Sequence, residues 1–263
     1  MVMLKNSENQ CLTSFLLGRK CVYCGHRKLC RTRRGYRKCY YCKRQKSLKR
    51  LKREILIISA FRRQQTALLT AHDIGIPYKA SKRIYNNLRL AIIRQCEREA
   101  GKMSGEIEMD EAYFGGRRKG QRGRGAAGKS IVFGLLERDG RVYTRVVDAV
   151  SKEILMDVIR RKSRKGSVYY TDQFRSYNSL KRYGKHYALN HGKTFVRKGK
   201  KRSVHINGIE GFWSFAKHGL YNYRGVSRSM FPLYLKEMEY RYNHRRDNLL
   251  HLLIQLYFGG NTT

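Results

Sequence analysis

Acidic residues are scarce in this chain. Its 263 residues include 58 Lys and Arg but only 19 Asp and Glu, which gives a formal net charge of +39. Residues 158–236 contain 19 Lys or Arg and just two carboxylates, Asp172 and Glu210. Acidic side chains repel phosphate, so a surface that binds phosphate should contain few of them. The acids that remain are candidate ligands of a divalent cation.

Long apolar runs are also missing. The longest, such as residues 55–60, fall far short of the roughly 18 residues of a membrane span, and the N-terminus has no signal-peptide pattern. We therefore expect no membrane partner, and a cytoplasmic, nucleoid-associated protein in a bacterium or a nuclear one in a eukaryote. The 41% hydrophobic content supports a folded core, and the charge predicts double-stranded DNA as partner. A merely cationic surface, or attachment to anionic lipid, is the alternative.

The chain has only seven cysteines, and four of them form two Cys-x-x-Cys motifs. Two Cys-x-x-Cys pairs, fourteen residues apart, predict one tetrahedral, structural Zn²⁺ site within residues 1–51, a zinc ribbon with a basic N-terminal region. Its ligands would be Cys21, Cys24, Cys39 and Cys42. Redox or structural thiols are the alternatives, and the other three cysteines are interpreted as ordinary reduced thiols.

Cations and tyrosines alternate along the predicted ribbon. Arg33, Arg34 and Arg37 are candidate DNA contacts, because cations clamp phosphates while neighbouring tyrosines add hydrogen bonds or stacking. A ribbon that binds protein, basic only because the whole chain is basic, is the other interpretation.

Residues 52–104 have the periodicity of helices. Gly75 and Pro77 separate two apolar stripes, which is compatible with a helix-turn-helix whose recognition helix carries Lys82 and Arg83. A plain helical connector fits the same pattern.

Residues 105–263 change to strands that alternate with helices. Strands are predicted at 106–113, 130–136 and 142–147, then a helix at 152–161, a strand at 168–172 and a helix at 174–182. Three strands with hairpin links, followed by helix, strand and helix, is the order of a ribonuclease-H-like α/β domain. Asp110 lies in the first of these strands, and Asp172 ends the last.

A further helix begins near residue 206 and has two stripes. The apolar one contains Ile206, Ile209, Trp213, Ala216 and Leu220, and the polar one contains Asn207, Glu210, Ser214 and Lys217. Glu210 could therefore bind metal while Lys217 holds phosphate. Two divalent ions roughly 3.5–4 Å apart need carboxylates from separate elements, and Asp110, Asp172 and Glu210 could converge on them. Each acid taken singly could instead be a surface carboxylate.

Three motifs, which follow one another along the chain, resemble those of a known protein family. They are residues 106–129, from Glu-Ile-Glu-Met-Asp-Glu through a Gly- and Arg-rich loop, the Val-Tyr-Tyr-Thr-Asp of 168–172, and residues 205–217. Together they resemble the ISXO-like insertion-sequence DDE transposases, related to the Merlin group.

The resemblance implies cutting of DNA at element ends by activated water, then joining of the 3′-hydroxyl to target DNA. It implies Mg²⁺ or Mn²⁺, no covalent enzyme intermediate, and at least a homodimer on DNA. Asp110 and Asp172 map onto the first two acids and Lys217 onto the trailing lysine. Relatives have an acid or Asn at the third position; we choose Glu210, because a charged carboxylate is the harder ligand, with Asn207 as alternate or supporting ligand.

The loop at 115–129 carries six cations and six glycines, and its Arg117, Arg118 and Arg124 are candidate DNA contacts. Arg241, Arg245 and Arg246 could also reach DNA. Two other functions stay open: a ribonuclease-H-like metal nuclease, and a catalytically silent DNA-binding regulator derived from a transposase.

Overall fold

The computed structural model describes residues 20–115, 129–138, 140–172, 175–189, 197–198, 203–223 and 225–259. The chain forms two compact units, Met1–Arg94 with His244–Thr263, and Gln95–Asn243. The predicted boundaries at 51 and 104 stay a prediction, since the compact units divide the chain after Arg94 and after Asn243. None of the helices in the described ranges is long and apolar enough to cross a membrane.

The first unit begins with a small antiparallel sheet. Its strands are β1 (Leu29–Arg31), β2 (Tyr36–Cys39) and β3 (Gln45–Ser47), in the order β1-β2-β3. Gly35 has a positive φ of 73° in the turn between β1 and β2, a conformation that glycine adopts without a Cβ clash. The sheet brings the two Cys-x-x-Cys segments to the same place.

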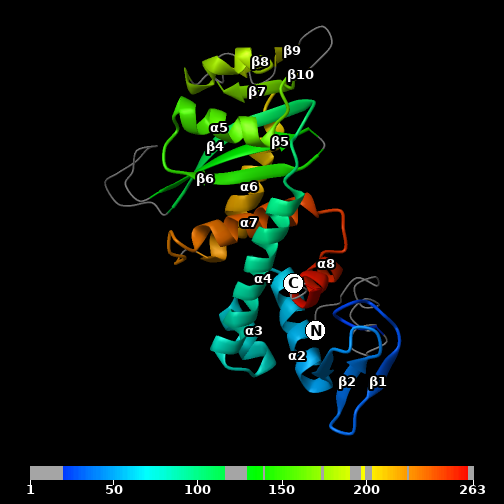
Figure 1. Ribbon diagram of the computed structural model, residues 1–263. Helices are drawn as coiled ribbons and strands as arrows, with labels where there is room; N and C mark the ends of the chain where they lie inside the picture. The colour runs from blue at the N-terminus through cyan, green and yellow to red at the C-terminus, as the bar shows by residue number, and fades with distance from the viewer. Residues whose placement is uncertain are drawn as a thin grey trace. The chain divides into compact units, whose positions relative to one another are not determined.

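Four helices complete this unit: α2 (Leu48–Arg62), α3 (Ala67–Ile74), most of α4 (Tyr78–Glu99) and α8 (Leu249–Gly259). Thr66 caps α3 by accepting a hydrogen bond from the backbone N–H of Leu69, and Gly75 ends the helix in the left-handed conformation. The hydroxyls of Thr70 and Tyr85 are 2.7 Å apart and join α3 to α4. Helix α8 packs on α2 (Figure 1).

The second unit is built on a five-stranded sheet, in the order β6-β5-β4-β7-β8. Strand β5 is antiparallel to β4 and β6, whereas β7 is parallel to β4 and β8 to β7. The bounds are β4 (Glu106–Phe114), β5 (Ser130–Glu137), β6 (Val142–Val147), β7 (Val168–Asp172) and β8 (Lys185–Leu189). The predicted strands are confirmed, but β8 was not predicted.

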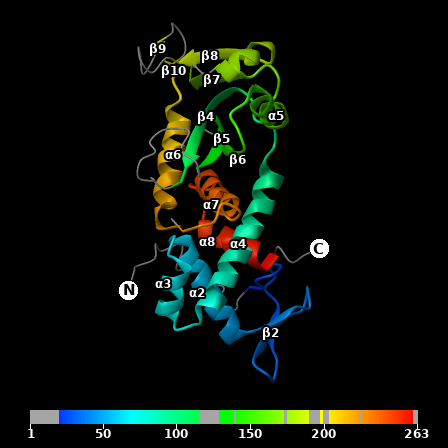
Figure 2. The same cartoon turned by 90° about the vertical axis from the view of Figure 1, so that its left-hand side faces the viewer.

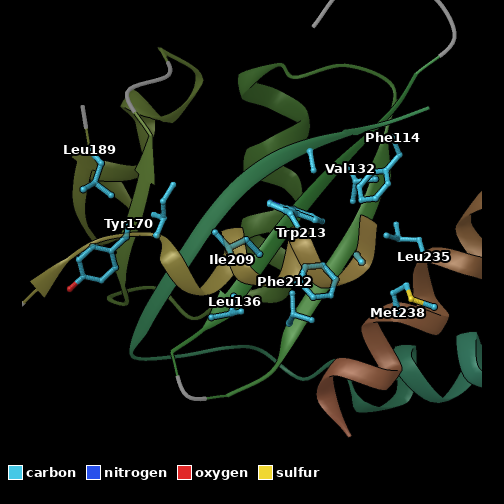
Figure 3. Close-up of a cluster of buried hydrophobic side chains, with 14 of the residues drawn as sticks. Phe114, Val132, Leu136, Tyr170, Leu189, Ile209, Phe212, Trp213, Leu235 and Met238 are labelled. Carbon is cyan, nitrogen blue, oxygen red and sulfur yellow. The ribbon is translucent and has the colours of Figure 1, made fainter. Parts of the chain in front are cut away.

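Helices cover both faces of this sheet. α5 (Lys152–Lys162) lies on one face, and α6 (Asn207–Gly219) and α7 (Phe231–Asn243) lie on the other (Figure 2). Ile209, Phe212 and Trp213 of α6 pack against strand residues such as Val132 and Leu136 (Figure 3). The burial therefore follows the apolar stripe read from the sequence. Short segments complete the unit: η1 (Arg175–Arg182), β9 (Arg197–Lys198), β10 (Ser203–Val204) and η2 (Tyr221–Tyr223).

Candidate active site

The register of two parallel strands brings Asp110 and Asp172 together. Glu106 pairs with Val168 and Glu108 with Tyr170, so the same register continued up the strands places Asp110 beside Asp172. Successive side chains of a strand alternate between faces, so Asp110 and Asp172 belong to the face that α6 covers. Both are partly buried. Asp172 is the last residue of β7, and Asp110 lies in the middle of β4, level with the carboxyl end of β7, where open α/β sheets bind ligands.

A third carboxylate joins this pair, and it is Glu111. Asp110, Glu111 and Asp172 each offer one oxygen, and these oxygens lie within 4.8 Å of one another. Burial raises the pKa of Asp110 to about 6, and the negative charges of Asp172 and Glu210 contribute to the rise. Three converging hard oxygen ligands fit a divalent cation such as Mg²⁺ or Mn²⁺, whose charge would favour the ionised carboxylates.

The indole of Trp213 orients Asp110. Its Nε1–H donates a hydrogen bond of 3.1 Å to Asp110 Oδ2. Gly134 pairs with Asp110 across β4 and β5, and a Cβ on this glycine would lie 2.6 Å from Cζ2 of Trp213. The glycine therefore makes the room in which the indole reaches the carboxylate. Sequence reasoning assigned Trp213 to the core alone.

Glu108 anchors the start of α6. This carboxylate, 1% exposed, accepts a hydrogen bond of 3.0 Å from the backbone N–H of Ile209 and another of 3.0 Å from Nε of Arg138. Arg138 also donates to Glu106 at 2.7 Å and to the carbonyl of His205 at 2.8 Å. A buried acid at a helix N-terminus satisfies an orphan N–H and complements the helix dipole. It therefore fixes α6 against the strand that carries Asp110.

The polar stripe of α6 is exposed, as its periodicity predicts. Asn207, Glu210, Ser214 and Lys217 are all exposed. Among the residues with described side chains, Glu210 is outside the 4.8 Å cluster, although its charge acts on Asp110. The Nζ of Lys217 lies 6.0 Å from the centroid of the Phe114 ring. Glu210 therefore adjoins the cluster without being part of it.

Comparison with known proteins identifies the family. The sequence model of the ISXO2-like transposase domain matches residues 102–243. The chain belongs to this transposase family. The match contains the acid cluster and all of α6 and α7, and it confirms the resemblance read from the three motifs.

Other similar proteins are transposase-related too. A transposase-like protein of Haemophilus influenzae is 40% identical over 105 residues, which is 40% of this transposase and 82% of the relative. Two solved Mos1 structures, a strand transfer complex and a pre-cleavage transpososome, are each 12% identical, with TM-scores of 0.32 and 0.33. They cover 76% of this chain, and the chain covers 74% and 75% of theirs.

The four cysteines of the two Cys-x-x-Cys pairs form a second cluster. The sulfurs of Cys21 and Cys42 are 3.6 Å apart, those of Cys24 and Cys39 are 3.7 Å apart, and all four lie within 4.8 Å of one another. Four thiolates about 2.3 Å from one Zn²⁺ would lie about 3.8 Å apart, whereas a disulfide brings two sulfurs to about 2.0 Å.

Backbone N–H groups favour thiolates at this cluster. Burial alone would raise the pKa of Cys39, but hydrogen bonds from the backbone of Cys42 and Tyr41 help to lower it to about 7. The backbone of Tyr23 and Cys24 likewise hydrogen bonds to Cys21, but there burial outweighs these bonds and raises the pKa of the thiol to about 12 without a metal ion. The donor set therefore fits a structural zinc ion.

The predicted DNA contacts fall into three groups. Arg33 and Arg34 are exposed in the turn after β1, Arg37 is half-buried on β2, and Lys82 and Arg83 are exposed on α4. Arg117, Arg118 and Arg124 lie outside the described residues. The prediction for Arg241 was wrong: it is 5% exposed and donates to buried Glu237 at 2.8 Å, because it lies on the side of α7 that packs inward.

Two functional residues, Glu111 and Glu108, were missed in the sequence, each for its own reason. Glu111 follows Asp110 directly, and strict alternation along a strand would send it to the opposite face. Glu108 matched the polar side of a half-buried strand and gave no sign of its burial. Four acids in residues 106–111, in a chain so poor in acids, were the available signal.

Proposed function

We propose that this protein is a DNA transposase that cuts at the ends of an insertion sequence and joins the freed 3′-hydroxyl to target DNA, using divalent metal ions. Its catalytic domain is of the ribonuclease-H-like type, because a five-stranded sheet with one antiparallel inner strand carries acids on two neighbouring parallel strands, Asp110 within β4 and Asp172 at the end of β7. The observation that carries the proposal is the meeting of Asp110, Glu111 and Asp172 within 4.8 Å.

Asp110 and Asp172 would hold the metal, with further oxygens from neighbouring acids. When bound, divalent ions activate the attacking oxygen and stabilise the leaving oxygen of an in-line phosphoryl transfer. The protein's own part is to hold the carboxylates rigidly. Trp213 fixes one oxygen of Asp110, and Glu108 fixes the helix that carries Trp213. Preorganised ligands of this kind lose little entropy when the metal binds.

The third acidic ligand has two candidates. Glu111 is supported by its place in the cluster, and Glu210 by its position on the exposed stripe of α6 and its effect on the pKa of Asp110. We keep Glu210 as the family-type third ligand with Asn207 as its alternate, and propose Glu111 as an additional ligand. Two ions need more oxygens than three carboxylates can direct at one point, so the candidates are compatible.

Lys217 would contact a phosphate of the DNA. It lies two helical turns from Glu210 on the same exposed stripe, so a phosphate next to the metal site is within reach of its ammonium. Lys is suited to this role because it is a compact point charge with three donors.

The N-terminal unit would bind the element ends. Its cysteine cluster would hold a structural Zn²⁺, and exposed Arg33 and Arg34 lie in one turn of the ribbon. Cutting two ends in one reaction requires two active sites, so we propose a homodimer or larger assembly on double-stranded DNA.

The test is cleavage and joining of labelled DNA that carries the ends of the element. Purified protein is incubated with Mg²⁺ or Mn²⁺, and wild type is compared with Asp172→Ala. We expect cleaved and joined products from wild type and none from the variant. Cleavage without joining would indicate a nuclease, and salt-sensitive binding without any product would indicate a regulator.

The third ligand is tested by Glu111→Gln and Glu210→Gln, with exposed Asp148→Asn as control. Binding of Mn²⁺ is measured by calorimetry on each variant, alongside cleavage. A ligand's loss should weaken Mn²⁺ binding about 10- to 100-fold or more. A variant that cuts and binds Mn²⁺ as wild type does would remove that residue from the site.

A further inference from the structure

The N-terminal unit contains a cationic pocket that the proposed chemistry does not use. It has a volume of about 450 Å³ and lies among α2, α4 and α8, which Figure 1 shows together, and Lys46 of β3. Volumes of roughly 300–1,000 Å³ are typical of pockets that hold a small ligand. Its lining includes four cations and one acid: Lys46, Arg50, Arg83, Arg94 and Glu54.

Two arginines from different helices converge on one tyrosine. Burial raises the pKa of Tyr257 to about 12, and Glu54 adds to the rise while the charges of Arg50 and Arg83 oppose it. Arg50, Arg83 and Tyr257 all line this pocket. Glu54, the acid of the lining, is already paired with Lys46 and with Arg50, whose Nε is 3.1 Å from Oε1.

One side of α4 forms a wall of the pocket. Arg83, Asn87, Leu90, Ala91 and Arg94 recur at helical spacing and face it. Arg83 and Arg94 form no ion pair with any residue in the described part of the chain, and they lie about 16 Å apart along the axis. Leu90 is 43% exposed, so the wall also offers an uncovered apolar side chain. The pocket therefore combines cations, an amide, an apolar surface and aromatic rings.

We propose that this pocket binds one unstacked nucleotide of a DNA strand, with its phosphate between Arg50 and Arg83 and its base against Leu90 and Tyr257. Asn87 would hydrogen bond to the edge of the base. The proposal rests on the proposed function only in taking DNA as the partner.

The shape of the site favours an unstacked nucleotide over a duplex. A duplex presents phosphates on a convex surface and keeps its bases stacked inside, so it can touch the rim of a pocket but cannot fill it. A single strand can place a base against aromatic and apolar side chains while cations track its phosphates.

The experiment compares binding of a labelled oligo-dT of about 12 nucleotides with a duplex of equal length, by fluorescence anisotropy without divalent metal. The proteins are wild type, Arg83→Ala, Tyr257→Leu and, as a charge-matched control, Arg53→Ala. Arg53 is exposed on the same helix as Arg50 but does not line the pocket. Arg83 is exposed, so its variant should fold even if Tyr257→Leu does not.

We expect Arg83→Ala to weaken oligo-dT binding about tenfold relative to Arg53→Ala and to reduce the salt slope by about 1. Duplex binding should stay within about threefold, which would assign Arg83 to the pocket and not to the duplex contact predicted from the sequence. Equal losses on both DNAs would overturn the proposal in favour of a duplex-backbone contact, and no loss beyond the control would overturn it outright. Cleavage is assayed separately with Asp172→Ala, so selective oligo-dT binding without metal-dependent products would leave the pocket standing while the proposed chemistry fails.

Discussion

Replacing Asp110 by Asn should stabilise the protein while abolishing its response to metal. The carboxylate is held in a partly buried position next to Asp172 and Glu111, and Asn keeps an oxygen that can accept the hydrogen bond from Trp213. The variant thus removes a charge and little else. A site organised for a cation is expected to be strained without it, and removing the charge should release that strain.

The magnitude follows from the pKa. Burial, with the charges of Asp172 and Glu210, raises the pKa of Asp110 from 3.8 to about 6. Each tenfold change in acidity corresponds to about 1.4 kcal/mol, so the ionised carboxylate costs about 3 kcal/mol of folding free energy at pH 7. The cost is absent below the unfolded pKa near 4, because both states are then protonated. It develops between about pH 4 and 6, and it is complete above the folded pKa.

The assay is thermal unfolding followed by the fluorescence of Trp213, the only tryptophan of the chain. At pH 7 without divalent metal, Asp110→Asn should unfold about 3–10 °C above wild type, and the two should converge near pH 4. Added Mn²⁺ should raise the transition of wild type alone, by the linkage of binding to folding. Asp148→Asn, an exposed acid in the same unit, is the control. A variant that is less stable at pH 7, or equally shifted at pH 4 and pH 7, would refute the reasoning.

Three more predictions concern the supports of the two clusters. Gly134→Ala should shift Trp213 emission and destabilise by about 1–3 kcal/mol in urea unfolding, because its Cβ would overlap the indole; unchanged emission would contradict the packing. Glu108→Ala should cost about 3–5 kcal/mol, since it leaves Arg138 and the N–H of Ile209 without this acid, and Glu108→Gln should recover part of the loss; equal stability of both variants would disprove the anchor. Cys39→Ser should release the zinc measured by atomic absorption and unfold the ribbon, whereas full zinc content would show that Cys39 is not a ligand.

Much of the fold could be predicted from the sequence, because the periodicity of its apolar residues agrees with the burial of those residues in the structure. The strands and helices between residues 106 and 172 match their predicted ranges within about two residues. Strand β8 was missed because Lys185–Leu189 is short and mostly exposed at the edge of the sheet, so the alternation that marks a strand is weak there. The segment predicted as a helix at 174–182 is a 3-10 helix at Arg175–Arg182.

Only part of the candidate site could be predicted from the sequence, because the site is assembled by the register in which strands β4 and β7 pair. The sequence could nominate Asp110 and Asp172, but the pairing of Glu106 with Val168 is what sets them side by side. The density of acids at 106–111 marks the segment but does not show which face Glu111 occupies, and nothing local reveals that Gly134 makes room for an indole. Such contacts join residues far apart in the chain. They form only when the whole sheet has assembled, so local sequence patterns do not reveal them.

The distribution of positive charge around β4 separates its acids by role. Glu106 and Glu108 both pair with Arg138, which also stacks 3.9 Å from the centroid of the Tyr170 ring. Asp110, two residues on, has no ion pair with any basic side chain in the described ranges and accepts a hydrogen bond from an indole instead. The chain has 58 basic residues, so a basic side chain next to this carboxylate would be common. A lysine or arginine there would lower the pKa of Asp110 but occupy its oxygens, so its absence is what we expect where a bound metal ion provides the positive charge.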